Sequence, residues 1–164
     1  PNRPNSLSTV QFRIGPGQDL ALVVEGYAGA RSNYLLELTQ EADPCDAPAV
    51  EPGPNEGNTQ ESQAHYAGSC APTIEAPEDI WIFRTMGPGT FCASLDADFD
   101  SVLYIRKDSC DQGREVGCND DHQDIGDSRV EFEALDQETF YLFVDGFFEE
   151  AGDYTLTVVP GECQ

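Results

Sequence analysis

Apolar and polar residues alternate along most of this chain. A period of two is typical of strands whose two faces meet different surroundings, and it predicts strands over residues 9–14, 20–27, 34–38, 79–84, 90–95, 101–106, 129–135, 139–146 and 154–159. Turns rich in Gly, Pro and Asp separate these runs, and no run combines a helical period with capping residues. Many short strands joined in this way predict an all-β fold, an antiparallel jelly-roll-type β-sandwich.

The beginning of the chain is a second copy of its end. Residues 8–38 align without a gap on residues 128–158, at a constant offset of 120 positions. The identical pairs are Ser8 and Ser128, Val10 and Val130, Phe12 and Phe132, Leu22 and Leu142, Val24 and Val144, Gly26 and Gly146, Tyr34 and Tyr154, and Leu36 and Leu156. We therefore expect a complete sandwich at 41–164, preceded at 1–40 by a partial repeat: the closing strands of a preceding module, or an assembly segment.

The partial repeat raises a packing problem. A three-strand fragment cannot bury its apolar face alone, so a partner surface is expected to cover Leu20, Leu22, Val24, Tyr34, Leu36 and Leu38. Residues 41–61, which follow, are rich in Pro, Gly, Glu and Asn. That composition predicts a linker or a long surface loop at the module boundary.

The charge of the chain excludes two classes of partner. Eight basic residues face thirty-one acidic ones, for a net charge of −23. This excess repels nucleic-acid phosphates and anionic membranes, and no apolar run approaches the ~20 residues that span a bilayer. We expect no nucleic acid and no membrane insertion, and we expect bound cations to offset the repulsion.

The six cysteines point to disulfides in an extracellular or cell-surface protein. The count is even, and the sequence has no CxxC or Cys/His metal spacing. Cys110 and Cys118 flank a short loop, and Cys70 precedes one strand pair while Cys92 lies in the next. We therefore expect the pairs Cys110 with Cys118, Cys70 with Cys92, and Cys45 with Cys163. Alternatively, Cys45 or Cys163 joins a neighbouring subunit.

Two acidic loops form a candidate calcium site. Its candidate ligands are Asp96, Asp98, Asp100, Asn119, Asp120, Asp121, Asp124 and Asp127. Carboxylate, amide and carbonyl oxygens suit Ca²⁺, which takes six to eight of them, although the spacing is not that of an EF-hand. The alternative is a pair of solvated acidic turns. Asp145 and Asp153 lie at strand ends, where Asp-Gly and Gly-Asp are ordinary turn chemistry.

An ordered set of motifs resembles a known bacterial family. The motifs are HYAGSC at 65–70, PEDIWIFR at 77–84, DFDSVLYIR at 98–106, CNDD at 118–121, SRVEFEAL at 128–135, and YLFVDGF followed by GDYTLTV within 141–158. This set resembles the pre-peptidase C-terminal domain in the cysteine-containing form found in secreted multidomain proteins. The resemblance covers roughly residues 45–160 and implies a secreted, non-catalytic jelly-roll β-sandwich. Such domains accompany proteases or adhesins, and some relatives bind calcium, collagen or carbohydrate.

The sequence favours a structural role over catalysis. His65 and His122 are the only histidines, and no nucleophile elbow, HExxH or phosphate-binding loop is present. We expect no enzyme, but an extracellular, calcium-stabilised structural or adhesive protein. Its N-terminal strands would dock on copies of itself or on adjacent repeat modules, in a filament or a tandem array. The alternative is a collagen- or carbohydrate-binding accessory module of a secreted bacterial enzyme.

Overall fold

The chain divides into two units, residues 1–40 and residues 41–164. The computed structural model describes residues 8–10, 12, 19–29, 31, 33–39, 43–71, 73–120 and 127–164. Across these ranges, no helix is both long enough and apolar enough to cross a membrane.

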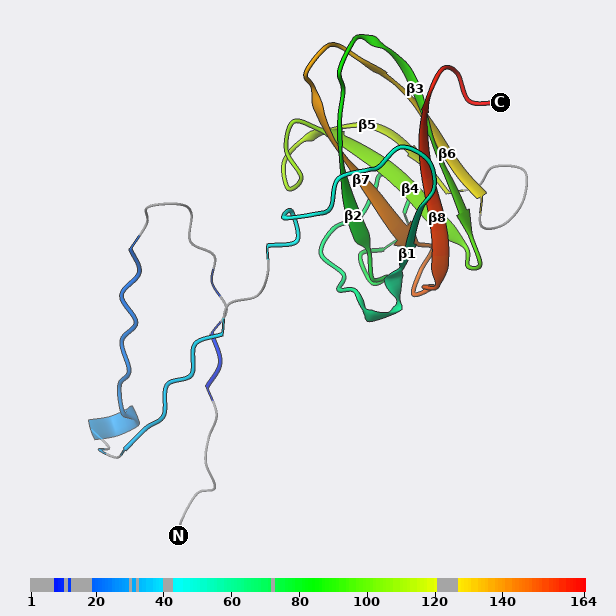
Figure 1. Ribbon diagram of the computed structural model, residues 1–164. Coiled ribbons are helices and arrows are strands. Elements are labelled where there is room, and N and C mark those ends of the chain that lie inside the picture. The colour runs from blue at the N-terminus through cyan, green and yellow to red at the C-terminus, as the bar shows by residue number, and fades with distance from the viewer. Residues whose placement is uncertain are drawn as a thin grey trace. The chain divides into compact units, whose positions relative to one another are not determined.

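The second unit is a β-sandwich of eight strands (Figure 1). The strands are β1 (Asn55–Asn58), β2 (Asp79–Arg84), β3 (Gly89–Ala97), β4 (Ser101–Lys107), β5 (Arg114–Asn119), β6 (Asp127–Ala134), β7 (Thr139–Gly146) and β8 (Asp153–Pro160). The first sheet has the order β1-β8-β3-β6 and the second the order β2-β7-β4-β5. Every connection except the β4–β5 hairpin crosses between the sheets, as in a jelly roll. The predicted fold class is confirmed.

Alternating burial explains why these segments form strands. Along β6, the side chains of Ser128, Val130, Phe132 and Ala134 are buried, while those between them are partly or fully exposed. β2, β3, β4, β6, β7 and β8 coincide with predicted strands to within two residues at each end. β1 and β5 were not predicted, because neither carries a clear apolar alternation.

Two apolar layers cover the second sheet, one on each face. The inner core lies between the sheets and includes Leu103 and Ile105 of β4. Val102 and Tyr104 of the same strand belong to a separate cluster. Since successive side chains of a strand point to opposite faces, this cluster lies on the outer face of the second sheet, and we call it the outer layer. The connection between β1 and β2 supplies part of its cover, including Tyr66 and Cys70.

The segment predicted as a linker, residues 41–61, is part of the domain over its described residues from 43 onward. It contains β1, the 3₁₀ turn η2 (Thr59–Glu61) and a disulfide at Cys45. The Val50 amide donates to the Ile82 carbonyl at 2.9 Å. The Asn58 side chain caps η2 by accepting from the Gln60 amide at 2.8 Å. Linker composition was misleading here because backbone and polar side-chain bonds hold the segment, rather than large apolar residues.

All six cysteines form disulfides, as predicted, but every predicted pair is wrong. The bridges join Cys45 to Cys110, Cys70 to Cys118, and Cys92 to Cys163. The predicted pairs were Cys110 with Cys118, Cys70 with Cys92, and Cys45 with Cys163.

The sandwich explains the error. Cys118 lies opposite Tyr104 in the β4–β5 ladder, several positions from the hairpin turn that holds Cys110. Cys70 and Cys118 belong to the outer layer of the second sheet. Cys92 alternates with the inner-core residues Ala93 and Leu95, so it faces outward from the first sheet. A bridge from Cys70 to Cys92 would therefore cross both sheets, which pack about 10 Å apart.

The described residues of 1–40 form no strand. Their one element is the 3₁₀ turn η1 (Tyr27–Gly29), so the strands predicted at 20–27 and 34–38 are absent, as is any strand in the described part of 9–14. Large apolar side chains there are between 39% and 91% exposed, namely Val10, Phe12, Leu20, Leu22, Val23, Val24, Tyr34, Leu35, Leu36 and Leu38. This exposure explains why the predicted strands are absent, because strands without a covered apolar face are not stable in water.

Candidate functional site

The acidic loops predicted to bind calcium come together only in part. Asp96 near the end of β3 lies directly opposite Asp127 at the start of β6. Asp98 instead accepts from the Asp153 amide at 2.9 Å, and the Asp98 amide donates to the Asp153 carbonyl at 3.1 Å. Asp96 therefore faces the start of β6, whereas Asp98 is bonded to the start of β8.

The second acidic loop also makes bonds of its own. Asn119 accepts from the Arg129 amide at 2.9 Å through its side-chain oxygen, and the Arg129 guanidinium lies 3.8 Å from the Asp127 carboxylate. In the first acidic loop, the Asp100 amide donates to the Glu150 carboxylate at 2.8 Å. Asp120 ends the described part of this loop, and the predicted ligands Asp121 and Asp124 lie outside the described residues, as does His122.

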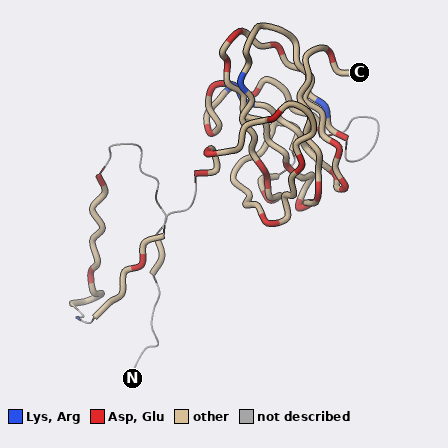
Figure 2. The backbone as a smooth tube through the Cα atoms, in the orientation of Figure 1, with Lys and Arg blue, Asp and Glu red and all other residues tan. Residues whose placement is uncertain are grey.

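The described residues include no group of three or more His, Cys, Asp or Glu side chains placed to hold a metal ion. Calcium therefore stays a prediction. Acidic residues are spread widely along the backbone of the sandwich rather than gathered at one loop (Figure 2).

A buried group of acids in the outer layer was not predicted. Glu78, which directly precedes β2, is 5% exposed, Asp145 of β7 is 1% exposed, and Tyr104 of β4 is fully buried. Asp145 was expected to be an ordinary turn residue. It does accept from the Gly146 amide at 2.8 Å, but it shares its strand face with Phe143, an outer-layer residue. That alternation was the sequence signal for a buried carboxyl.

Burial changes the acidity of these groups. It raises the pKa of Glu78 from 4.5 to about 7, against the lowering effect of hydrogen bonds from the His65 and Tyr66 amides. It raises the pKa of Asp145 from 3.8 to about 8, and the negative charge of Glu78 adds to the rise. Burial also raises the pKa of the Tyr104 hydroxyl, with Glu78 and Asp145 contributing. The three groups are electrostatically coupled. At neutral pH, Asp145 and Tyr104 are mainly protonated, whereas Glu78 is divided between its protonated and ionised forms.

Two of the buried oxygens lack partners. The Tyr104 hydroxyl and the Asp145 Oδ2 atom have no hydrogen-bond partner among the described residues. Glu78, by contrast, accepts from the amides of His65 and Tyr66 at 3.0 Å each. An unpaired buried oxygen is costly, and far more so when charged, which agrees with the raised pKa of Asp145.

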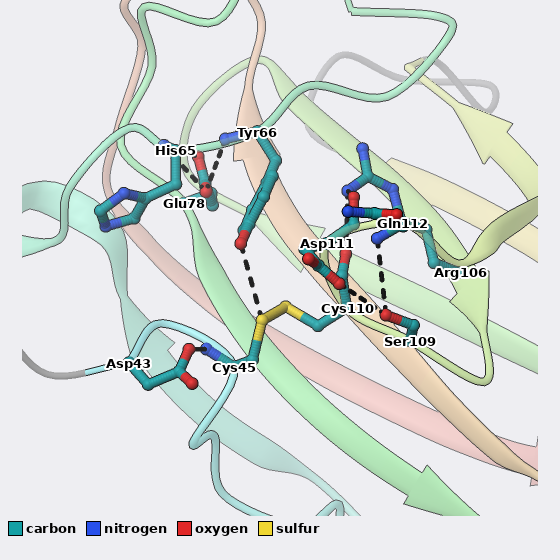
Figure 3. Close-up of a disulfide and its surroundings, with 10 residues drawn as sticks. All are labelled: Asp43, Cys45, His65, Tyr66, Glu78, Arg106, Ser109, Cys110, Asp111 and Gln112. Atoms are coloured by element: carbon teal, nitrogen blue, oxygen red, sulfur yellow. Dashed lines mark hydrogen bonds between the residues drawn. A yellow bond between two sulfur atoms is a disulfide. The ribbon is translucent and has the colours of Figure 1, made fainter. Parts of the chain in front are cut away.

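Arg106 and two disulfides hold the cover over this group. Figure 3 shows Arg106, Glu78 and the bridge between Cys45 and Cys110. The Arg106 guanidinium donates to the Cys110 carbonyl at 2.9 Å and to the Ala67 carbonyl at 3.2 Å. It also lies 5.0 Å from the ring centroid of Phe143 and 5.1 Å from that of Tyr66. The Tyr66 hydroxyl contacts Cys45 Sγ at 3.6 Å. The buried acids are therefore sealed from solvent beneath this cover.

Three aromatic residues of the sandwich differ in their surroundings. Trp81 lies against the inner core and donates from Nε1 to the Tyr154 hydroxyl at 2.8 Å. Phe147 packs on the outer layer, whereas its neighbour Phe148 is 55% exposed.

Comparison with known proteins identifies the fold. No protein-family model and no curated protein matches this chain. Among solved structures, it is similar to the crystal structure of the pre-peptidase C-terminal domain of collagenase from Bacillus anthracis, with a TM-score of 0.51 and 15% sequence identity. The similarity covers 73% of this chain and 100% of that domain. This chain has the fold of a pre-peptidase C-terminal domain. The resemblance seen in the motifs is thus confirmed at the level of the fold.

The pre-peptidase C-terminal fold is complete without the first unit. All eight strands lie between residues 55 and 160, and the three bridges join cysteines from position 45 onward. The described residues of 1–40 contribute no strand to this sandwich, and residues 8–38 resemble its last three strands in sequence.

Proposed function

We propose that this chain is a non-catalytic, structural module of a secreted protein, joined to a neighbouring module through residues 1–40 in a filament or a tandem array. The observation that carries the proposal is the exposed apolar copy of β6, β7 and β8 beside a sandwich that already has these strands. Three disulfides within one chain support an extracellular location. The pre-peptidase C-terminal fold supports a role as an appended domain.

Size measurement combined with limited proteolysis tests this proposal. Assemblies larger than a monomer, with residues 1–40 protected from protease, support a filament of copies. A monomer with residues 1–40 cut rapidly supports a tandem array whose preceding module is missing from the sample. A monomer with residues 1–40 protected contradicts the proposal, because the segment would then be covered by its own chain. Residues 41–164 provide the matched control chain.

Calcium is proposed as the stabilising ion at the end of β3. Asp96 and Asp127 face one another across the ladder, and like charges in directly opposed positions destabilise a sheet. A cation shared with Asp120 and with the loop that follows it would relieve this repulsion, as would be favourable at a net charge of −23. Hard oxygen ligands suit Ca²⁺.

Thermal unfolding in the presence of calcium and of a chelator tests the ion. We expect calcium to raise the midpoint, and the variant Asp96→Asn to lose most of that rise. Glu133→Asn serves as control, since its side chain is exposed on β6 away from this end. Equal midpoints with calcium and with chelator in the parent chain would exclude a stabilising calcium site.

The second candidate is a collagen- or carbohydrate-binding accessory module. The similarity to a domain of a collagenase favours it, and the exposed Phe148 ring, 4.8 Å from Phe147, offers an aromatic contact. Co-sedimentation with collagen fibrils or insoluble polysaccharide, compared between the parent and Phe148→Ala, tests this role. Binding by the monomer that Phe148→Ala abolishes would favour the accessory module over the structural one.

A further inference from the structure

The two copies of the closing strands carry the same residues at the positions that face the inner core of the sandwich. This inference rests on the proposed joining role of residues 1–40 and identifies what covers them. In the complete domain, the repeated apolar positions belong to the inner core and are at most 4% exposed, namely Val130, Phe132, Leu142, Val144, Tyr154 and Leu156. Their N-terminal counterparts, Val10, Phe12, Leu22, Val24, Tyr34 and Leu36, are at least 39% exposed. The first copy therefore carries an inner face without the opposing strands.

The repeat extends to positions that have special requirements in the sandwich. Ser128 is fully buried at the start of β6 and donates from Oγ to the Ser101 carbonyl at 2.8 Å, and its counterpart is Ser8. At Gly146, a Cβ atom would overlap the Glu150 carbonyl in the turn after β7. The counterpart there is Gly26. Apolar composition alone would not reproduce a buried serine and a glycine required by a tight turn.

The two copies disagree on the outer face of the second sheet. In β7, Phe143 stacks on Tyr104 with ring centroids 4.4 Å apart and nearly parallel planes, and Tyr141 packs against the same outer layer. The residues at these positions in the first copy are Val23 and Ala21. Neither can replace an aromatic ring, so the first copy would leave a cavity beneath the cover of this chain's own outer layer.

The two copies also differ in a cysteine, at the outer face of the first sheet. Cys163 follows β8 and bridges to Cys92 in β3, whereas the position 120 residues earlier is Asp43. The Asp43 side chain accepts from the Cys45 amide at 3.0 Å, and Cys45 bridges to Cys110 within the complete domain. A sandwich closed by the first copy would lack the bridge that anchors the end of β8 here.

From these observations we infer that residues 8–38 are the β6, β7 and β8 strands of a separate, preceding sandwich whose outer layer is smaller than that of residues 41–164. The surface that covers them is a set of strands equivalent to β1–β5 of that preceding module. It is not the β1–β5 of a second copy of this chain, because that acceptor is built for Tyr141 and Phe143. The chain thus belongs to a tandem array of non-identical modules.

A graft within the full chain tests the inference. Residues 128–158 are replaced by the sequence of residues 8–38, while residues 159–164 and Cys163 are kept. A second graft adds Ala21→Tyr and Val23→Phe to the transplanted sequence. Thermal unfolding and the protection of residues 43–120 from protease are measured for the parent and both grafts, with Phe143→Val in the parent as a matched control.

We expect both grafts to fold with all three disulfides. The plain graft should unfold at a midpoint lower than the parent's by roughly 5 °C or more, and the two outer-face substitutions should recover most of that loss. If neither graft folds, the strand equivalence is wrong. If the plain graft is as stable as the parent, the outer face does not discriminate, and a second copy becomes the better acceptor. Both outcomes are separate from a monomer with residues 1–40 protected, which would overturn the proposed joining role itself.

Discussion

Acid should stabilise this domain through two buried carboxyls, and the variant Asp145→Asn should remove about half of that effect. The pKa of Asp145 is raised to about 8 and that of Glu78 to about 7, in both cases mainly by burial. In the unfolded chain both carboxyls ionise near pH 4. The folded state therefore binds two more protons than the unfolded state between pH 5 and pH 6.5.

The sign and size of the effect follow from proton linkage. A raised folded-state pKa makes a carboxyl contribute stability that is complete below its unfolded pKa and is lost as the pH rises toward its folded pKa. Each such carboxyl changes the free energy of unfolding by about 1.4 kcal/mol per pH unit in this window. The two together predict a fall of about 3 kcal/mol for each unit of rising pH. Surrounding charges adjust the window, since Arg106 lowers and Asp79 raises the pKa of Glu78.

Urea unfolding at several pH values, followed by the fluorescence of Trp81, measures this slope, because Trp81 is the only tryptophan. Asp145→Asn keeps the oxygen that accepts from Gly146 and removes the ionisation, so its slope should be shallower by about 1.4 kcal/mol per pH unit. Glu133→Gln, on an exposed face of β6, is the control for general charge repulsion. Parallel profiles for the parent and Asp145→Asn between pH 5 and pH 6.5 would show that Asp145 ionises with the same pKa in the folded and the unfolded chain.

The two copies of the closing strands also predict opposite responses to the same substitution. Leu142→Ala should lower the free energy of unfolding by about 3 kcal/mol because Leu142 is fully buried. Leu22→Ala should leave that of the monomer unchanged, and equal losses for the two would contradict the assignment of the inner core. Tyr154→Phe should cost about 1–3 kcal/mol, since the Tyr154 hydroxyl accepts from Trp81 at 2.8 Å and donates to Asp79 at 2.7 Å. An unchanged urea midpoint would show that this chain of bonds contributes nothing.

Local pattern was sufficient for six of the eight strands of the sandwich and insufficient for the contacts between them. The alternation along β6 and β7 is a property of neighbouring residues, so it could be read directly. β5 was not predicted because Gly117 interrupts its alternation of apolar and polar residues. A register shift also separates the pairing of Ile105 from that of Arg106. The predicted cysteine pairs were wrong because pairing depends on which face of which sheet each sulfur occupies. Proximity in sequence, which suggested Cys110 with Cys118, says nothing about that face.

Residue pattern alone predicted the all-β class, most strand positions in the sandwich, the disulfide-bonded state of the cysteines and the second copy of the closing strands. Each of these follows from the order and type of nearby residues or from direct comparison of two segments. Only the tertiary structure decided the disulfide pairs, the burial of Glu78 and Asp145, and the division of the repeated residues into a shared inner face and a divergent outer face. Those properties arise where segments distant in sequence pack together, and burial there raises the pKa of Glu78 and of Asp145.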